Sequence, residues 1–173
     1  MTDYDNLKLD HQLCFALYAA THSLTRAYRV SLEKLGITYT QYLVLLVLWE
    51  QDGIAVGKIA QRLELDSATL TPMLKRLEVA GFVTRIRNTK DERIVEVKLT
   101  VAGNQLQHVL AQVQHGVACQ TGLSEGDFIQ LKDSLHRLVD TMSNCQVSNY
   151  QVSNYKVAGK SKPNSVKKAS HND

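Results

Sequence analysis

Residues 65–100 read LDSATLTPMLKRLEVAGFVTRIRNTKDERIVEVKLT, and a change of hydrophobic period within them decides the fold. The first half carries leucines at spacings of three and four, namely Leu70, Leu74 and Leu77. That spacing is typical of the buried face of a helix, so we expect a helix that begins at residue 66 or 67 and ends at Gly81. The second half carries apolar residues that alternate with charged ones, namely Val95, Val97 and Leu99. This alternation predicts a β-hairpin with strands at 83–87 and 93–99 around a polar turn.

One residue fits the predicted helix badly. Pro72 lies within its first two turns, where a proline removes a hydrogen bond and costs about 3 kcal/mol in an ordinary helix interior. A kink at Pro72, or a helix that starts closer to Thr71, is therefore an alternative to a regular helix.

Two shorter helices precede this stretch. Thr38 and Gln41 have the T-x-x-Q spacing of a capping box. The run at 42–49 that follows is apolar on all sides, so we expect a central, buried helix. A short helix is predicted over 56–63, and a break follows it at 64–66.

Long helical patterns flank the region on both sides. Upstream, Asp10 is placed to cap a helix over about residues 10–35, which Gly36 stops. Downstream, helical periodicity covers about residues 101–143, and Gly116 is expected to interrupt it. The apolar stripes of these long helices need a partner surface, and a second copy of the chain would bury them.

The order helix, short helix, helix and hairpin is that of a winged helix-turn-helix, in which one helix enters the major groove and the hairpin reaches the minor groove. The predicted fold class is therefore mainly α with a small β-hairpin wing and long N- and C-terminal dimerisation helices. We expect one domain over 1–145, with the wing and recognition region at about 55–99. Residues 146–173 are expected to form a disordered basic tail, because QVSNY occurs twice there before a Lys/Ser/Asn-rich end.

Positive charge is concentrated in the predicted recognition region. The whole chain carries a formal charge of +3, but five lysines and one aspartate follow residue 149, which leaves −1 for the rest. Residues 67–90 nevertheless hold five cations against Glu78 alone. This favours double-stranded DNA as a partner over the alternative of a solvated basic surface. The candidate DNA-binding residues are Ser67, Thr69, Thr71, Lys75, Arg76, Arg85, Arg87, Lys90, Asp91 and Arg93.

Membrane and secretory classes are disfavoured. The longest uninterrupted apolar run has eight residues, far short of the roughly 20 that a spanning helix needs. The first ten residues carry three aspartates and one lysine, the wrong charge for a secretory signal. We therefore expect a cytoplasmic protein.

The residues resemble those of a known family. Residues 39–99 look like the winged-helix region of MarR-type bacterial repressors, and they include the family's D-x-R element at 91–93. The opening LDHQLCFALYAA at 9–20 resembles more narrowly the organic-hydroperoxide-sensing branch, OhrR. The resemblance covers about residues 7–143. It implies that Arg93 enters the minor groove and that Asp91 orients it.

The OhrR resemblance also implies roles for two cysteines and two tyrosines. Cys14 matches the peroxide-reactive cysteine, and Tyr28 and Tyr39 match tyrosines that hydrogen-bond its sulfur. Cys119 stands where two-cysteine members carry a resolving cysteine that forms a disulfide between subunits. Cys145 has no counterpart, so an incidental free thiol is the simpler interpretation.

The chemistry of Cys14 also follows from the residues themselves. Near a helix N-terminus the amide dipoles favour the thiolate, the form that attacks a peroxide, although Asp10 opposes this in part. The product is a sulfenic acid, which a second thiol converts into a disulfide. Tyr18 lies on the same helical face one turn on. The alternative for Cys14 and for Cys119 is a small buried packing residue.

The resemblance thus implies a dimeric, nucleoid-associated bacterial repressor that binds operator DNA when reduced. It would release the DNA when organic hydroperoxide oxidises Cys14 and a disulfide forms to Cys119 of the partner subunit. Three other functions stay open at this point. In the first, a small aromatic acid or phenol bound between the dimer arms triggers release from DNA. In the second, the protein is a thiol peroxidase in which Cys14 turns over. The peroxidase alternative leaves the basic hairpin unexplained, so we do not expect an enzyme. A metal site at His108 and His115 is the weakest alternative, because a lone pair two helical turns apart is usually a surface feature. We expect neither metal nor cofactor.

Overall fold

The computed structural model describes residues 4–89, 91 and 93–144. The chain divides into two compact units, residues 1–123 and 124–173. All elements of the predicted winged helix belong to the first unit. The predicted tail at 146–173 and Cys145 lie outside the described residues, so the expected disorder and the end of the domain stay predictions.

Helix α1 (Leu13–Lys34) begins later than the sequence suggested. Asp10 does not cap it, because Asp10 lies in a separate 3₁₀ turn, Leu9–His11, and Gln12 is the residue that precedes α1. The side-chain amide of Gln12 donates to the carbonyl of Lys8 at 3.2 Å, which ties the two segments together. The predicted stop is confirmed, since Gly36 follows the helix with a φ of +71°.

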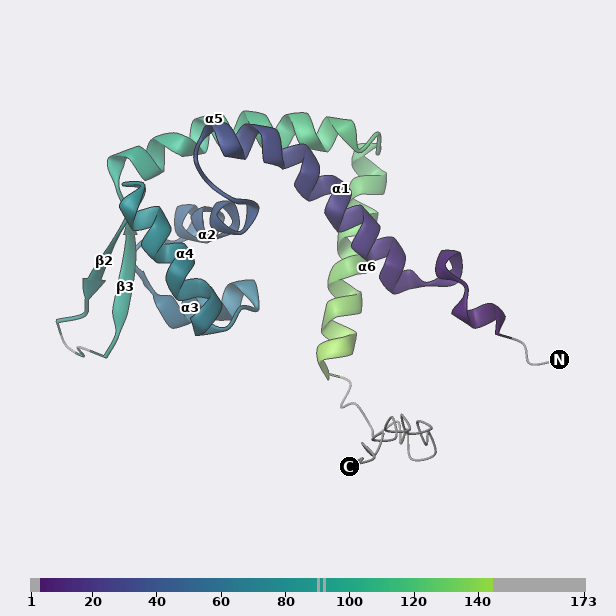
Figure 1. The fold of residues 1–173 in the computed structure, drawn as a ribbon, viewed down its shortest axis with the longest axis horizontal. Coiled ribbons are helices and arrows are strands. Elements are labelled where there is room, and N and C mark those ends of the chain that lie inside the picture. The colour runs from purple at the N-terminus through teal and green to yellow at the C-terminus, as the bar shows by residue number, and fades with distance from the viewer. Residues whose placement is uncertain (1–3, 90, 92, 145–173) are drawn as a thin grey trace, which may run out of the picture. The chain divides into compact units, whose positions relative to one another are not determined.

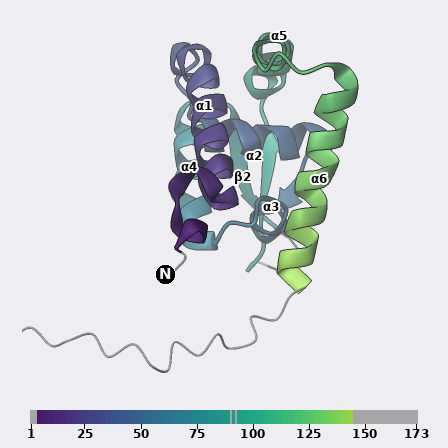
Figure 2. The same cartoon turned by 90° about the vertical axis from the view of Figure 1, so that its right-hand side faces the viewer.

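Helix α2 (Tyr39–Glu50) is the buried centre of the first unit, as predicted. The capping box is present: the amide of Gln41 donates to the hydroxyl of Thr38, and the amide of Thr38 donates to the side chain of Gln41. In both ribbon views α2 runs between α5 (Val101–Gln120) above it and α3 (Val56–Leu63) below it (Figures 1 and 2). Because α2 is apolar all round, it packs on several elements at once.

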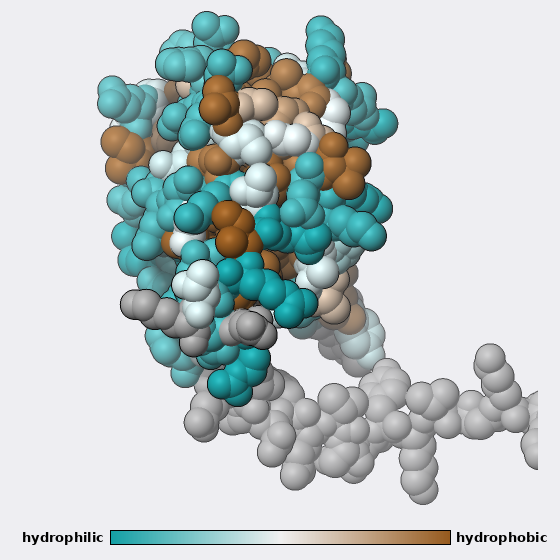
Figure 3. Space-filling model, turned by 90° about the vertical axis from the view of Figure 1, so that its left-hand side faces the viewer, coloured by the Kyte–Doolittle hydropathy of each residue, from teal (hydrophilic) through white to brown (hydrophobic). Residues whose placement is uncertain are grey.

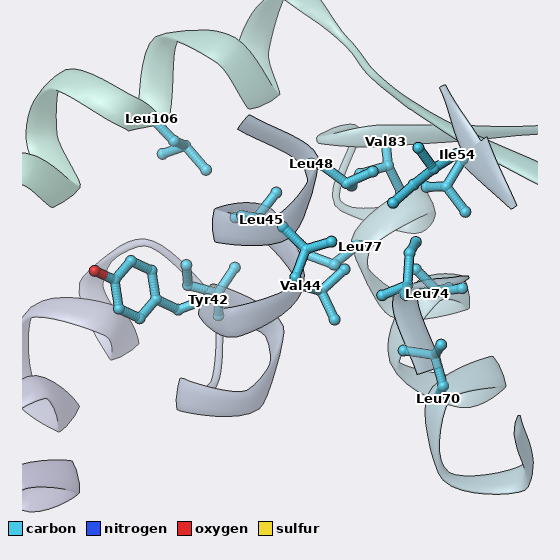
Figure 4. Close-up of a cluster of buried hydrophobic side chains, with 14 of the residues drawn as sticks. Tyr42, Val44, Leu45, Leu48, Ile54, Leu70, Leu74, Leu77, Val83 and Leu106 are labelled. Atoms are coloured by element: carbon cyan, nitrogen blue, oxygen red, sulfur yellow. The ribbon is translucent and has the colours of Figure 1, made fainter. Parts of the chain in front are cut away.

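Helix α4 (Ser67–Val79) completes the helix-turn-helix. Its cap is Asp66, and Pro72 lies inside it, so the alternative of a start near Thr71 is wrong. The leucines of the predicted inner face are almost completely buried, namely Leu70, Leu74 and Leu77. Figure 4 shows this face together with the α2 side chains Val44, Leu45 and Leu48 in one cluster.

The hairpin consists of β2 (Val83–Arg87) and β3 (Val95–Leu99), paired antiparallel with Val83 opposite Leu99. The second strand begins two residues later than predicted, because the amide of Ile94 donates to the carbonyl of Asp91 within the turn. The sequence prediction also missed a third strand, β1 (Ile54–Ala55), which pairs with the other side of β3. Two residues are too few for an alternating pattern to show.

Two long helices follow the hairpin, as predicted. Helix α5 (Val101–Gln120) is continuous, and Gly116 does not interrupt it. One glycine costs a helix interior only about 1 kcal/mol, which the rest of a 20-residue helix outweighs. Helix α6 (Glu125–Asn144) belongs to the second unit. Across the described ranges no helix is both long enough and apolar enough to cross a membrane.

A close backbone contact fixes the start of α5 on the winged helix. A Cβ atom at Gly103 would lie 2.1 Å from the carbonyl oxygen of Phe82, so only glycine fits. The indole Nε1 of Trp49 donates to the carbonyl of Gly103 at 3.1 Å. The hydroxyl of Thr100 donates to the carbonyl of Gly81 at 2.6 Å. These contacts attach α5 both to α2 and to the turn before β2.

This contact predicts opposite effects for two glycines of the same helix. Gly103→Ala should lower the free energy of unfolding by at least about 2 kcal/mol, because its Cβ collides with backbone. Gly116→Ala should raise it by about 0.5–1 kcal/mol, since no atom lies within 4 Å and alanine is the better helix former. Urea denaturation of both variants and the wild type measures this. Equal effects of the two substitutions would contradict the assignment.

Candidate functional site

The hydroxyls predicted to contact DNA lie at the exposed start of α4. The hydroxyl of Thr69 donates to the carboxylate of Asp66 at 2.8 Å, and the hydroxyl of Thr71 donates to the carbonyl of Ser67 at 2.6 Å. Hydrogen bonds from the amide and hydroxyl of Thr69 hold the pKa of Asp66 below its ordinary value. Two of the three predicted hydroxyl donors thus already donate their protons at the start of the helix. Towards a partner in solvent, their oxygens can act only as acceptors.

The structure groups the basic residues around α4 and the hairpin. Lys75 and Arg76 are exposed on α4, one turn or more beyond its capped start. A hollow of about 450 Å³ lies between the first half of α4, the start of α3 and the hairpin, and both Ser67 and Arg93 line it. On the face that carries the hairpin, hydrophilic side chains gather over the lower part and hydrophobic ones are scattered among them (Figure 3). A polar surface of this kind suits a hydrated, charged partner.

Arg85 differs from the other predicted DNA-binding cations, because it is already paired. Its guanidinium donates to one carboxylate oxygen of Glu78 from Nε at 2.9 Å and from Nη2 at 2.6 Å. Its backbone amide donates to the other oxygen at 3.1 Å. These hydrogen bonds lower the pKa of Glu78. The pair joins the end of α4 to β2, so its first effect is to hold the hairpin against α4.

Arg93 is positioned at the turn of the hairpin, and its side chain is 91% exposed. Its Nε donates to the carboxylate of Asp91 at 3.2 Å, and its backbone amide donates to the same oxygen at 3.1 Å. Asp91 and Arg93 are therefore paired at the turn, and the role of Asp91 in orienting Arg93 stays a prediction. Arg87 is also exposed, at the end of β2, whereas Lys90 lies outside the described residues.

Cys14 is exposed and lies in the first turn of α1, two positions nearer the helix start than the Asp10 cap implied. This location strengthens the interaction of a thiolate with the helix dipole, which acts mainly within the first turn. Tyr18, one turn further on, is exposed and packs against His22 with ring centroids 4.3 Å apart. Both sulfur and phenol are therefore accessible to a small molecule or to a second chain.

Tyr28 and Tyr39 come together, and they do so with a third tyrosine that the sequence interpretation did not single out. The ring centroids of Tyr28 and Tyr39 are 5.4 Å apart, and Tyr42 lies 5.4 Å from Tyr28. Burial raises the pKa of Tyr42 to about 12, and the neighbouring Tyr28 adds to this rise. Figure 4 shows the hydroxyl of Tyr42 pointing away from the leucine cluster. The three-residue spacing of Tyr39 and Tyr42 on one helix was the available signal.

The structure does not bring these tyrosines to Cys14 of the same chain. Cys14 precedes Tyr28 by fourteen residues on one continuous helix, which corresponds to about 21 Å along the helix at 1.5 Å per residue. Cys119 is exposed in the last turn of α5, and its Sγ lies 3.8 Å from Nε2 of His115. Cys14 and Cys119 are both free thiols. No group of three metal-binding side chains occurs in the described part of the chain, including around His108.

The helices and the three-stranded sheet define a winged helix-turn-helix protein, which confirms the predicted fold class. The family model of MarR proteins matches residues 37–95. The organic hydroperoxide resistance transcriptional regulator of Bacillus subtilis (strain 168) is 44% identical over 139 residues, which are 80% of this chain and 95% of that protein. The chain therefore belongs to the MarR family of transcriptional regulators.

Solved structures of AbfR in three chemical states, namely reduced, overoxidised and disulfide-bonded, are similar to this chain. Reduced AbfR bound to DNA matches with a TM-score of 0.69 and 35% identity, over 82% of this chain and 97% of AbfR. AbfR with its disulfide formed matches with a TM-score of 0.59 and 36% identity, over 80% and 92% of the two chains. AbfR thus forms a disulfide, and both its reduced and its overoxidised forms have been solved bound to DNA.

The raised pKa of Tyr42 makes stability depend on pH in the alkaline range. The folded protein favours the neutral phenol, so this contribution is complete below the ordinary value of 10.0 and is lost as pH rises to about 12. The free energy of unfolding of the wild type should fall by about 1–2 kcal/mol between pH 9 and pH 11.5. Tyr42→Phe should reduce this fall, whereas Tyr4→Phe, at an exposed position, should not. Urea denaturation at both pH values measures the free energy of unfolding. If it falls as much in Tyr42→Phe as in the wild type, the explanation is contradicted.

Proposed function

We propose that this protein is a dimeric transcriptional repressor that binds operator DNA when reduced and releases it when organic hydroperoxide oxidises Cys14. A disulfide to Cys119 of the partner subunit then holds the released form. The observation that carries this proposal is the exposed Cys14 thiol in the first turn of α1. The thiol supports this function because it lies in a winged-helix chain that is 44% identical to an organic hydroperoxide resistance regulator.

DNA would be bound by α4 and the hairpin. The start of α4 and its exposed Lys75 and Arg76 suit the major groove and its phosphates, and Arg93 at the turn suits the minor groove. The Arg85–Glu78 pair supports this by fixing the hairpin relative to α4. Two copies related by a twofold axis would place both α4 helices about one duplex turn apart.

The dimer is supported by apolar side chains that the first unit leaves in solvent along α1. These are Leu13, Phe15, Tyr18, Leu24 and Val30. Exposed apolar side chains in this number along one helix need cover, and in this family fold a second copy provides it. Dimerisation would also bring Cys14 close to the tyrosines, which lie far from it within one chain. If Tyr28 and Tyr39 hydrogen-bond the sulfur, they belong to the partner subunit, because Cys14 and Tyr28 of one chain lie about 21 Å apart along α1.

The redox step needs only the two thiols and the hydroperoxide. The Cys14 thiolate attacks the terminal peroxide oxygen, the O–O bond breaks, and the alkoxide takes a proton and leaves as an alcohol. Cys14 becomes a sulfenic acid. Cys119 of the partner subunit attacks its sulfur, and one water is released as the disulfide forms.

A second candidate trigger is favoured by one observation. A cavity of about 440 Å³ lies between α1 and the start of α2, and Arg26, Arg29 and Tyr39 line it. Arg29 is paired with Glu33 at 2.6 Å, but Arg26 has no ion pair within the ranges described. A small aromatic acid would suit this lining. Release of DNA by salicylate after alkylation of the thiols would support this alternative and contradict thiol sensing as the only trigger.

The proposed role of Arg93 is tested by binding. Arg93→Ala should weaken binding to a duplex selected from a random-sequence library by about 1–3 kcal/mol, because it removes one groove contact. Asp91→Ala should have a smaller effect, since the charge of Arg93 remains. Lys34→Ala removes an exposed cation from the end of α1 and serves as the control. Fluorescence anisotropy at fixed salt measures all three, and unchanged affinity in Arg93→Ala would exclude the contact.

The role of Cys14 is tested by release. Cys14→Ser should keep the DNA affinity of the reduced protein and lose its release by cumene hydroperoxide, because a hydroxyl is not oxidised by peroxide. Cys145→Ser is the matched control and should be released like the wild type. Gel-shift titration with increasing hydroperoxide measures both. Normal release of the Cys14→Ser variant would refute the sensor assignment.

A further inference from the structure

The thiol of Cys119 has one contact that the proposed function leaves unexplained. Nε2 of His115 lies 3.8 Å from its Sγ, and the four-residue spacing places both side chains on one side of α5. Within the described ranges, no other side-chain hydrogen bond or ion pair involves either residue. The imidazole and the thiol are therefore paired with each other.

This contact is not a product of core packing. His115 and Cys119 are both exposed, whereas the buried residues of this part of α5 are Leu110 and Val117 on another face. A thiol is a weak hydrogen-bond donor, and a neutral imidazole nitrogen is a good acceptor. The geometry thus provides the thiol with a proton acceptor that solvent and a second chain can approach.

From this geometry we infer that His115 accepts the proton of Cys119 when Cys119 attacks the oxidised cysteine. The inference rests on the proposed function, and it assigns to that mechanism a proton-transfer residue. Only the thiolate is a nucleophile in disulfide formation, so the proton must leave Cys119 at or before the attack. A base in contact with the sulfur accepts this proton directly, so that no water molecule has to accept it.

The step balances without any further reagent. The sulfur of Cys119 attacks the sulfur of the Cys14 sulfenic acid of the partner subunit, the S–S bond forms and the S–O bond breaks. His115 takes the thiol proton to its Nε2 and returns it to the leaving hydroxide, which departs as water. The organic hydroperoxide, already reduced to an alcohol, is the only oxidant, and His115 ends the step as it began.

Disulfide formation in the full chain provides the main test, in a Cys145→Ser background that leaves only the two relevant thiols. After a pulse of cumene hydroperoxide, non-reducing electrophoresis follows the covalent dimer and dimedone traps the sulfenic acid. His115→Gln should slow dimer formation by about tenfold or more and increase the trapped sulfenic acid. His108→Gln changes another exposed histidine of α5 and should behave like the wild type. A wild-type rate in His115→Gln would overturn the inference.

Added imidazole separates proton transfer from a structural effect. His115→Ala should form the disulfide as slowly as His115→Gln, and millimolar imidazole should restore much of the rate, because the vacated position is exposed. A merely structural role would not be rescued by a free base. Slow disulfide formation that imidazole leaves unchanged would therefore count against His115 as the proton acceptor.

A third measurement does not depend on Cys14 as the sensor. In a Cys14→Ser, Cys145→Ser background, the reaction of Cys119 with the small disulfide reagent DTNB reports on its thiol directly. His115→Gln should slow this reaction severalfold, and His108→Gln should not; equal rates would overturn the inference. If the wild type forms no peroxide-induced dimer, the proposed function fails, and the DTNB rates still decide whether His115 assists Cys119.

Discussion

The close contact between Gly103 and the carbonyl of Phe82 is the constraint on which the relation of the wing to the long helices depends. Strand β3 ends at Leu99 and α5 starts at Val101, so hardly any flexible chain separates them. The hydrogen bond from the indole of Trp49 to the carbonyl of Gly103 also fixes the start of α5 against α2. A rotation of α5 about its start would therefore move β3, and with it the strands paired to either side.

This constraint gives the proposed redox mechanism a physical route. Cys119 lies sixteen residues beyond Gly103 on one continuous helix, about 24 Å away. A disulfide at Cys119 would reposition the far end of α5, and a stiff helix carries that displacement to the wing. The Arg85–Glu78 pair extends the connection to α4, since it joins β2 to the helix proposed to read the major groove. Both proposed DNA-contacting elements would then shift as a unit.

Sequence patterns predicted the elements whose signals are local. The capping box at Thr38, the short helix α3 and the leucine face of α4 all follow from spacings within a dozen residues, and the structure confirms them. Two failures have different causes, of which one is local and the other is not. Asp10 is a good capping residue in principle, but the 3₁₀ turn around it keeps it out of α1. The strand β1 has two residues and exists only because β3 offers it an edge, which no local pattern records.

The candidate site was predicted less completely, because its decisive contacts join residues that the sequence separates. Glu78 counted only as an opposing charge until the turn after α4 brought Arg85 against it. Tyr42 belongs with Tyr28 because α1 and α2 pack together, which also raises its pKa by burial. The His115–Cys119 pair was different: its four-residue spacing was visible, yet each residue was assigned to a separate hypothesis, one to a metal and one to a disulfide. A contact on one exposed helix face unites them, and it requires no metal to explain the histidine.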